Sequence, residues 1–125
     1  MAAPNIVGVT TITGITTFVS LDSTNATNIV SNPADSGEVY KINTIIVSNI
    51  DGTSTANITV KIHQEAAGAG TSVPIASTID VTADSTLVVL DKASAIYLEE
   101  NKSISATASA ADDLAITCSY EEVSD

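Results

Sequence analysis

The sequence predicts an all-β fold: a single-domain antiparallel β-sandwich of eight or nine short strands, with jelly-roll and immunoglobulin-like connections both left open. Three observations support this prediction. Apolar residues recur at every second position in several segments, which is the period of a strand with one buried face. Clusters of turn-forming residues separate those segments at short intervals. The 125 residues suit one domain, and the apolar residues include one Phe, three Tyr and no Trp.

The strongest strand signals lie in residues 38–63. From Ala56 to His63 the even positions are apolar and the odd positions polar, which predicts a strand with one dry face. Residues 39–50 are apolar on both faces, with Ile42 and Ile46 on one and Ile45 on the other, which predicts a strand in the middle of a sheet or at a subunit contact. Asp51-Gly52 is typical of a tight turn with positive φ, so we expect the two strands to form a hairpin.

Six further strands are expected, at residues 29–31, 73–82, 86–90, 95–98, 103–108 and 114–120. Pro74 near the start of its segment indicates an edge strand, in which we expect Ile79 and Val81 to point inward. Residues 86–90 (TLVVL) form a short apolar run that predicts a buried strand.

The last strand has a regular alternation that ends in an acidic tail. Cys118 alternates with Leu114 and Ile116, which predicts a buried, reduced thiol. Residues 121–125 are expected to fray. The Gly-rich segment 65–72 lacks the lysine and helix of a phosphate-binding loop, so we expect an exposed hairpin tip.

The first twenty residues, MAAPNIVGVTTITGITTFVS, are uncharged and rich in β-branched residues. One interpretation makes them the first strand of the sandwich formed by residues 21–125. The other makes them an arm that adds a strand to a neighbouring subunit by edge pairing. Gly8 and Gly14 indicate a bend, a bulge or the close approach of another backbone. The large apolar side chains of this segment are the expected partner-binding residues: Ile6, Val7, Val9, Ile12, Ile15 and Phe18.

The net charge is −11, from 15 acidic residues and four lysines, without arginine. Four scattered lysines cannot neutralise a nucleic-acid duplex, so no nucleic-acid partner is expected. No apolar run approaches the roughly 20 residues of a membrane span, and the N-terminus lacks the regions of a secretory signal, so we expect neither membrane insertion nor secretion. The charge favours solubility and mutual repulsion of free subunits.

No residue pattern points to catalysis, and we expect no enzyme, cofactor or metal site. The adjacent carboxylates at 99–100, 112–113 and 121–122 would point to opposite faces of a strand, so a pair cannot easily act on one substrate. Calcium at Asp51 or at 112–113 is a weaker interpretation than a solvated turn, because no spacing matches a calcium-binding loop. His63 has no second His or Cys near it in sequence, so a surface position is expected.

Four segments, in this order, are similar to a known group of proteins: YKINTIIVSNIDG at 40–52, DSTLVVLDK at 84–92, IYLEE at 96–100 and SYEE at 119–122. Together they resemble small virion structural proteins of tailed phages, particularly those of marine cyanobacteria. The resemblance spans about residues 38–122 and leaves the N-terminal segment uncovered.

The resemblance implies a noncatalytic β-sandwich on a phage particle, made in the host cytoplasm. The expected role is a capsid decoration or cement protein on the capsid surface, homo-oligomeric and bound to the major capsid protein or other virion proteins. A tail, neck or fibre accessory and a receptor- or glycan-binding module are alternatives. The Thr/Asn-rich loops at 22–28 and 65–72 favour glycan binding, whereas the absence of Trp argues against it.

Overall fold

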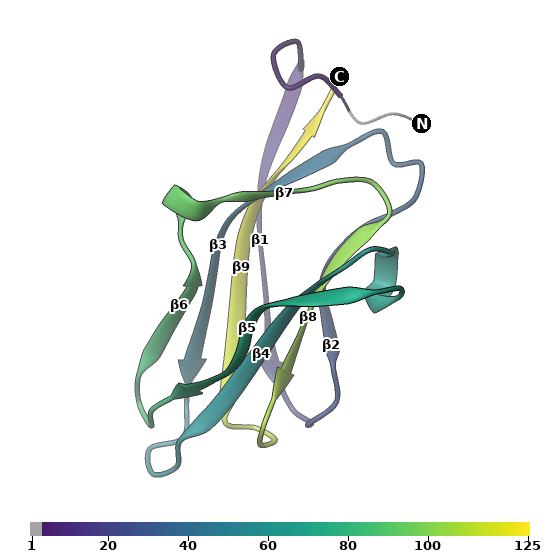
Figure 1. The fold of residues 1–125 in the computed structure, drawn as a ribbon. Coiled ribbons are helices and arrows are strands. Elements are labelled where there is room, and N and C mark those ends of the chain that lie inside the picture. Colours follow the sequence, from purple (N-terminus) through teal and green to yellow (C-terminus); the bar gives the residue numbers. More distant parts are fainter. Residues whose placement is uncertain (1–3) are drawn as a thin grey trace.

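The fold is an all-β sandwich in a computed structural model that describes residues 4–125, and the predicted fold class is confirmed (Figure 1). The strands are β1 (Thr11–Leu21), β2 (Thr27–Asn32), β3 (Val39–Asn49), β4 (Ala56–His63), β5 (Ser72–Val81), β6 (Thr86–Leu90), β7 (Ile96–Leu98), β8 (Lys102–Ala108) and β9 (Leu114–Ser124). Two short 3₁₀ helices, η1 (Ala66–Gly68) and η2 (Lys92–Ser94), interrupt the connections.

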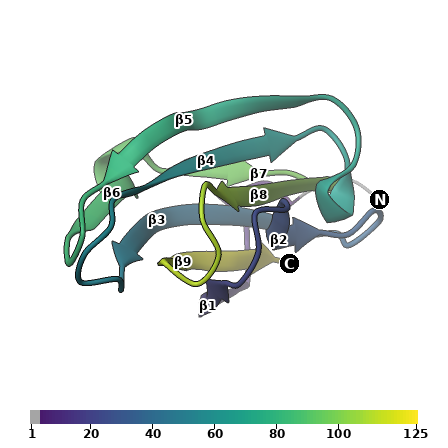
Figure 2. The same ribbon diagram turned by 90° about the horizontal axis from the view of Figure 1, so that it is seen from below.

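Two antiparallel sheets form the two layers seen in Figure 2. Sheet A has the order β1-β9-β3-β6, with β7 also paired to β3, and sheet B has the order β2-β8-β4-β5. Six of the eight connections between these strands pass from one sheet to the other. Each sheet is therefore assembled from segments that are distant in sequence.

The expected hairpin between residues 39–50 and 56–63 is wrong. β3 lies in sheet A and β4 in sheet B, so the connection between them crosses the sandwich. Asp51 and Gly52 do not adopt positive φ, whereas a tight hairpin turn of this kind would require it. Alternation of apolar residues is the same in a hairpin and in a sheet-crossing arch, so the pattern could not separate the two.

β3 is central, as expected, because it pairs with β9 on one side and with β6 and β7 on the other. The assignment of its faces is corrected by a register shift between Ile42 and Thr44. This extra residue places both Ile42 and Ile45 in the core and turns Ile46 to the outer face. A strict period of two cannot anticipate such a bulge.

The core lies between the sheets and consists mainly of aliphatic side chains, among them Leu21, Ile58, Ile104, Leu114 and Ile116. Cys118 is fully buried, as predicted, and burial raises the pKa of its thiol to about 12. Tyr40 and Tyr120 stack at one end of the core with their ring centroids 5.2 Å apart.

Two buried asparagines join the sheets. Asn32, the last residue of β2, donates from Nδ2 to the carbonyl oxygens of Glu38 and Leu98, both at 3.0 Å. Asn49, the last residue of β3, donates from Nδ2 to the carbonyl oxygens of Ser54 and Val81 at 2.9 and 2.8 Å. Because Leu98 and Val81 belong to the opposite sheet in each case, the two amides fasten the layers. Their value lies in satisfying buried carbonyls that would otherwise lack partners.

Other expectations fail where an element is longer or less enclosed than predicted. The acidic tail does not fray up to Ser124, because β9 runs to that residue between β1 and β3. A Cβ atom added at Gly14 would have no atom within 4 Å, and the register of β1 on β9 is continuous. Gly14 therefore marks neither a bulge nor the close approach of another backbone. In β6 only Leu90 is buried.

β5 confirms part of its prediction. It is the edge strand of sheet B, as Pro74 indicated, and Val81 is buried. Ile79 lies opposite the fully buried Ile58 but remains 42% exposed. It faces the correct layer, yet the edge position leaves it without neighbours on one side.

Candidate protein-binding surfaces

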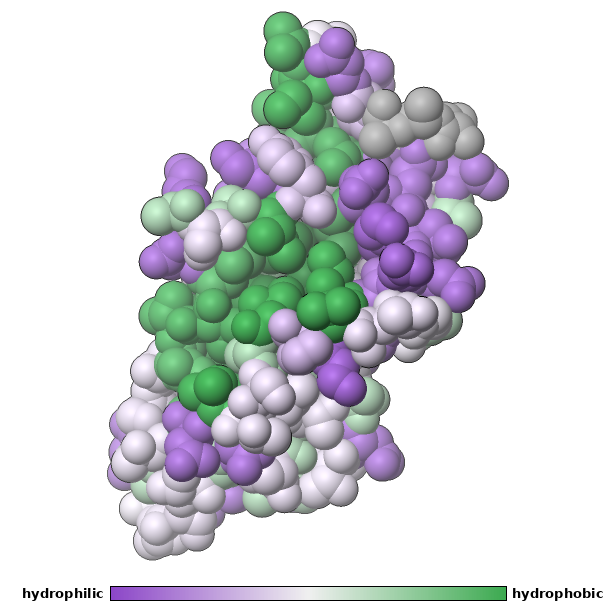
Figure 3. Space-filling view, in the orientation of Figure 1, coloured by the Kyte–Doolittle hydropathy of each residue, from purple (hydrophilic) through white to green (hydrophobic). Residues whose placement is uncertain are grey.

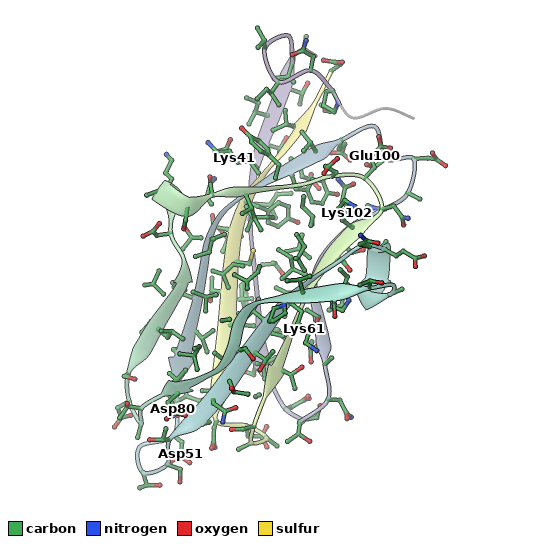
Figure 4. The ribbon with its side chains drawn as sticks, in the orientation of Figure 1. Lys41, Asp51, Lys61, Asp80, Glu100 and Lys102 are labelled. Carbon is green, nitrogen blue, oxygen red and sulfur yellow. The ribbon has the colours of Figure 1, made fainter. Side chains whose placement is uncertain are left out.

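Charge is divided unevenly between strands and loops. The strands contain three acidic residues and three lysines: Asp80, Glu121, Glu122, Lys41, Lys61 and Lys102. The other twelve acidic residues and Lys92 lie outside the strands, so the whole net charge of −11 belongs to the connections and the last residue. Figure 4 shows Asp51 near the lower end of the sandwich and Glu100 toward the upper end. Both ends of the sandwich are therefore acidic, while its sheets have no net charge.

The expected partner-binding residues do not form one surface. Ile12 and Phe18 are exposed on β1, and Ile6 and Val7 are exposed in the segment before it. Val9 is partly buried, and Ile15 is partly buried because it lies opposite Tyr120 on the core side of sheet A. We call the four exposed side chains the N-terminal edge: Ile6, Val7, Ile12 and Phe18.

β1 pairs with β9 of its own chain from Thr11 to Leu21 and forms one border of sheet A. This is the position that the first-strand interpretation expects of residues 11–20. Contact of residues 4–10 or of the free side of β1 with a neighbouring subunit stays a prediction. The strand has no ionisable side chain, so it has none of the lysines that commonly block edge pairing.

A second apolar area lies on the opposite border of the molecule, where β5 of sheet B and β6 and β7 of sheet A leave the sandwich open. Figure 3 shows hydrophobic surface gathered over this region. We call it the open side and define it by four exposed side chains: Val73 and Ile79 on the core-facing side of β5, and Val88 and Tyr97 on the outer face of sheet A. Val73 is 61% and Val88 56% exposed. Partly buried side chains such as Ile75 continue from it into the core.

A groove of about 280 Å³ opens beside the open side. Ile62, Val73 and Tyr97 supply apolar lining, and Glu99 and Lys102 contribute charges of opposite sign. The groove thus offers an apolar depression without net charge.

His63 also lines the groove, and its expected surface position is wrong. The ring is buried, and Nε2 lies 2.7 Å from Oγ of Ser105 in a hydrogen bond. Nδ1 is buried with no hydrogen-bond partner among the described residues. The alternation of β4 placed His63 on the outer face correctly, but it could not reveal that the chain covers this face.

The cover is the connection between β4 and β5, which folds back over sheet B. The N–H groups of Ala67 and Gly68 donate to Oγ of Ser31 and of Ser103 at 2.9 and 2.8 Å. Ser103 in turn donates to the carbonyl oxygen of Glu65 at 2.7 Å. The prediction of a hairpin at this point is confirmed, since β4 pairs with β5. The residues at its tip, however, are hydrogen-bonded to sheet B.

The structure brings together carboxylates considered for calcium. Asp51 and Asp113 interact through their side chains, and the pKa of Asp113 is raised by partial loss of hydration and by the adjacent charge of Asp51. Hydrogen bonds from Thr53 lower the pKa of Asp51. Within residues 4–125, no group of three His, Cys, Asp or Glu side chains is placed to hold a metal ion.

The adjacent carboxylates of β9 separate as the strand geometry requires. Glu121 accepts a hydrogen bond from Nδ2 of Asn43 at 3.0 Å on the outer face of sheet A. Glu122 interacts with the hydroxyl of Tyr40 and contributes to raising the pKa of that phenol, after the larger effect of burial. The two carboxylates therefore face different environments.

Sequence reasoning missed the open side, because it placed TLVVL in the interior and left Tyr97 without a role. The available signal was the shortness of β6 together with Pro74, since short strands and prolines are typical of sheet borders.

None of the helices in the described part of the chain is long and apolar enough to span a membrane.

A comparison with protein-family models found no match, and a comparison with curated protein sequences found none either. Among solved structures, the chain is similar to a Bacillus protein from the work "Bacillus endospore appendages form a novel family of disulfide-linked pili". The two share 16% identity with a TM-score of 0.53, over 91% of this chain and 88% of the other. At this identity the similarity concerns the fold.

Proposed function

We propose that the protein is a noncatalytic structural subunit that assembles with other protein on the surface of a phage particle, most simply as a capsid decoration protein. One observation supports the proposal above the others: two exposed apolar areas, the N-terminal edge and the open side, lie on segments whose one charged residue is Asp80, in a chain of net charge −11. Exposed apolar surface that gathers in one region is typical of protein contacts. The resemblance to virion proteins supplies the particle.

A noncatalytic role agrees with how the acidic side chains are used. Twelve of the fifteen lie outside the strands, where they keep the two ends of the sandwich hydrated. On β9 the adjacent carboxylates Glu121 and Glu122 each interact with a neighbouring side chain on a different face.

Quantitative mass spectrometry of purified particles tests the proposal directly. A decoration protein is expected in many copies per particle, in a fixed ratio to the major capsid protein. Absence from purified particles would exclude a virion role.

Binding of recombinant protein to particles that lack it locates the contact. Deletion of residues 1–10 leaves all nine strands in place and removes Ile6 and Val7, so we expect a folded protein with weaker particle binding. Circular dichroism is the control for folding. Unchanged binding would contradict the role of the N-terminal edge.

A second candidate is a subunit of a protein fibre, which the fold similarity to a pilus-related protein favours. Disulfide links through Cys118 are not part of this candidate, because that thiol is fully buried. Negative-stain electron microscopy of concentrated protein should then show filaments that persist in reducing agent. Uniform small particles at every concentration would exclude it.

A further inference from the structure

Large apolar side chains that remain substantially exposed are confined to a few places in the described part of the chain. Four belong to the N-terminal edge, where Val7 is 91% and Phe18 77% exposed. Four belong to the open side. The remaining one, Ile50, lies in the connection between β3 and β4. Exposed apolar surface is thus divided into two areas of similar composition.

The two areas lie on opposite borders of the molecule. β1 and β6 are the two ends of sheet A, with β9 and β3 between them. Three strand spacings separate them, about 15 Å at about 4.8 Å per spacing. Within one copy, β1 is paired with β9 and β6 is paired with β3. These pairings hold the two areas apart, so one copy cannot bring its own two areas into contact.

A second copy of this chain can approach only where charge is sparse. Copies with a charge of −11 repel one another wherever their connections meet. β1 and β6 contain no ionisable side chain, β5 contains only Asp80, and the groove adds one carboxylate and one ammonium. The two borders are therefore where identical copies can meet with the least repulsion.

We propose that the N-terminal edge of one copy packs against the open side of a second copy. The free side of β1 would meet the free side of β6, so main-chain hydrogen bonds would continue sheet A from one copy into the next. The two surfaces differ, which makes the contact heterologous and leaves one unused surface at each end. This inference names the partner surface of the proposed structural subunit and rests on that function.

The experiment uses the full-length protein in sedimentation velocity at increasing concentration, in 0.15 and 0.5 M NaCl. Concentration-dependent association is expected, and it should be stronger at the higher salt because the Debye length falls from about 8 Å to a few Å and screens the repulsion between acidic ends. Phe18→Lys and Val88→Lys change one surface each, and each is expected to weaken association at least tenfold. Both substitutions reduce the negative charge, so nonspecific repulsion cannot explain a loss.

Ile50→Lys is the matched control. Ile50 is 58% exposed, similar to Val88, and receives the same charge change outside the residues that define the two surfaces. It should associate as the unchanged protein does, and circular dichroism of all three variants establishes that they fold.

A mixture of Phe18→Lys and Val88→Lys distinguishes a heterologous contact from a symmetric one. Each variant retains the surface that the other lacks, so the mixture should form one-to-one dimers and no longer chains. Loss of association with Phe18→Lys alone would indicate a symmetric contact through β1 and overturn the inference. A mixture that stays monomeric would overturn it as well.

A protein that stays monomeric under all these conditions also overturns the inference. Particle binding then decides the proposed function separately. Monomers that bind particles would leave a structural role in place with a different partner on these surfaces.

Discussion

The outer faces of the two sheets are built from similar residues but end in different environments. On sheet B, Ser103 points outward yet is buried, because the connection between β4 and β5 folds over it, and Ser105 is buried beside His63. On sheet A, Phe18 of β1 and Val88 of β6 point outward and remain exposed among the described residues. Outward Ser, Thr and Ile residues therefore do not define a free surface; the path of the connections decides which face is available to a partner.

This difference gives outer polar groups of sheet B a structural role and leaves outer side chains of β1 and β6 exposed. The end strands of the two sheets differ in the same way. The N–H of Ala67 in η1 donates to Oγ of Ser31 in β2, whereas β1 pairs with a strand on one side alone among the described residues. Substitutions on the two sheets should accordingly separate folding from assembly.

The largest effect is expected in thiol reactivity across sheet A. Cys118 points into the core and its pKa is raised to about 12, so only about one thiol in ten thousand is ionised at pH 8. We expect labelling by a thiol reagent to be at least roughly a thousandfold slower in the folded protein than in urea. A Thr117→Cys, Cys118→Ser variant moves the thiol to the outer face and should label rapidly. Equal rates for the two positions would show that the faces of β9 are misassigned.

The next effect concerns the amides that fasten the layers. Asn49→Ala removes the donors to the carbonyls of Ser54 and Val81 and the acceptor for the N–H of Asp51, and we expect a loss of about 3 kcal/mol in the free energy of unfolding. Asn57→Ala on the outer face of β4 is the matched control, with an expected change below about 0.5 kcal/mol. Urea denaturation measures both. Similar losses would indicate that Asn49 does not join the sheets.

A smaller effect compares two outward serines directly. Ser103→Ala leaves the N–H of Gly68 and the carbonyl of Glu65 without their partner, which should cost about 2 kcal/mol. Ser119→Ala on the outer face of sheet A breaks only an exposed hydrogen bond from Thr16 and should cost less than about 0.5 kcal/mol. If Ser119→Ala is the more destabilising, the outer face of sheet A, and not that of sheet B, is the one whose serine contributes to stability.

The smallest effect is expected at the acidic end. The raised pKa of Asp113 means that the folded protein binds this proton more tightly than the unfolded chain does. Its contribution is therefore fully present below the unfolded pKa and is lost as pH rises through the folded pKa. Asp113→Asn should be slightly more stable than the unchanged protein at pH 7, and the difference should disappear in strong acid. Thermal unfolding across the acid range measures this, and a destabilised variant at pH 7 would contradict the assignment.

The sequence predicted features that depend on a local residue pattern, such as the buried face of a strand. It did not predict how the connections pass between the two sheets. The inward alternation of Leu114, Ile116 and Cys118 fixed the faces of β9, and Pro74 indicated an edge. The hairpin after Asn49 was wrong because a turn signal does not state which sheet receives the next strand. The bulge after Ile42 changed the faces of β3 for a similar reason, since one additional residue leaves composition unaltered.

The candidate surfaces were predicted only in part. The N-terminal segment stood out by its apolar, uncharged composition, and four of its six named residues are exposed. The burial of His63 and the exposure of Val88 could not be predicted, because both depend on contacts between segments far apart in the chain.

The location of charge in the connections has a geometric consequence for any assembly built through the sheet borders. Copies joined side by side would align their acidic ends along two parallel rims, above and below the row of sandwiches. A second row approaching from either rim would meet like charge, whereas growth along the row would not. Thickness would then be limited to a single molecule by electrostatics alone, without a dedicated capping protein.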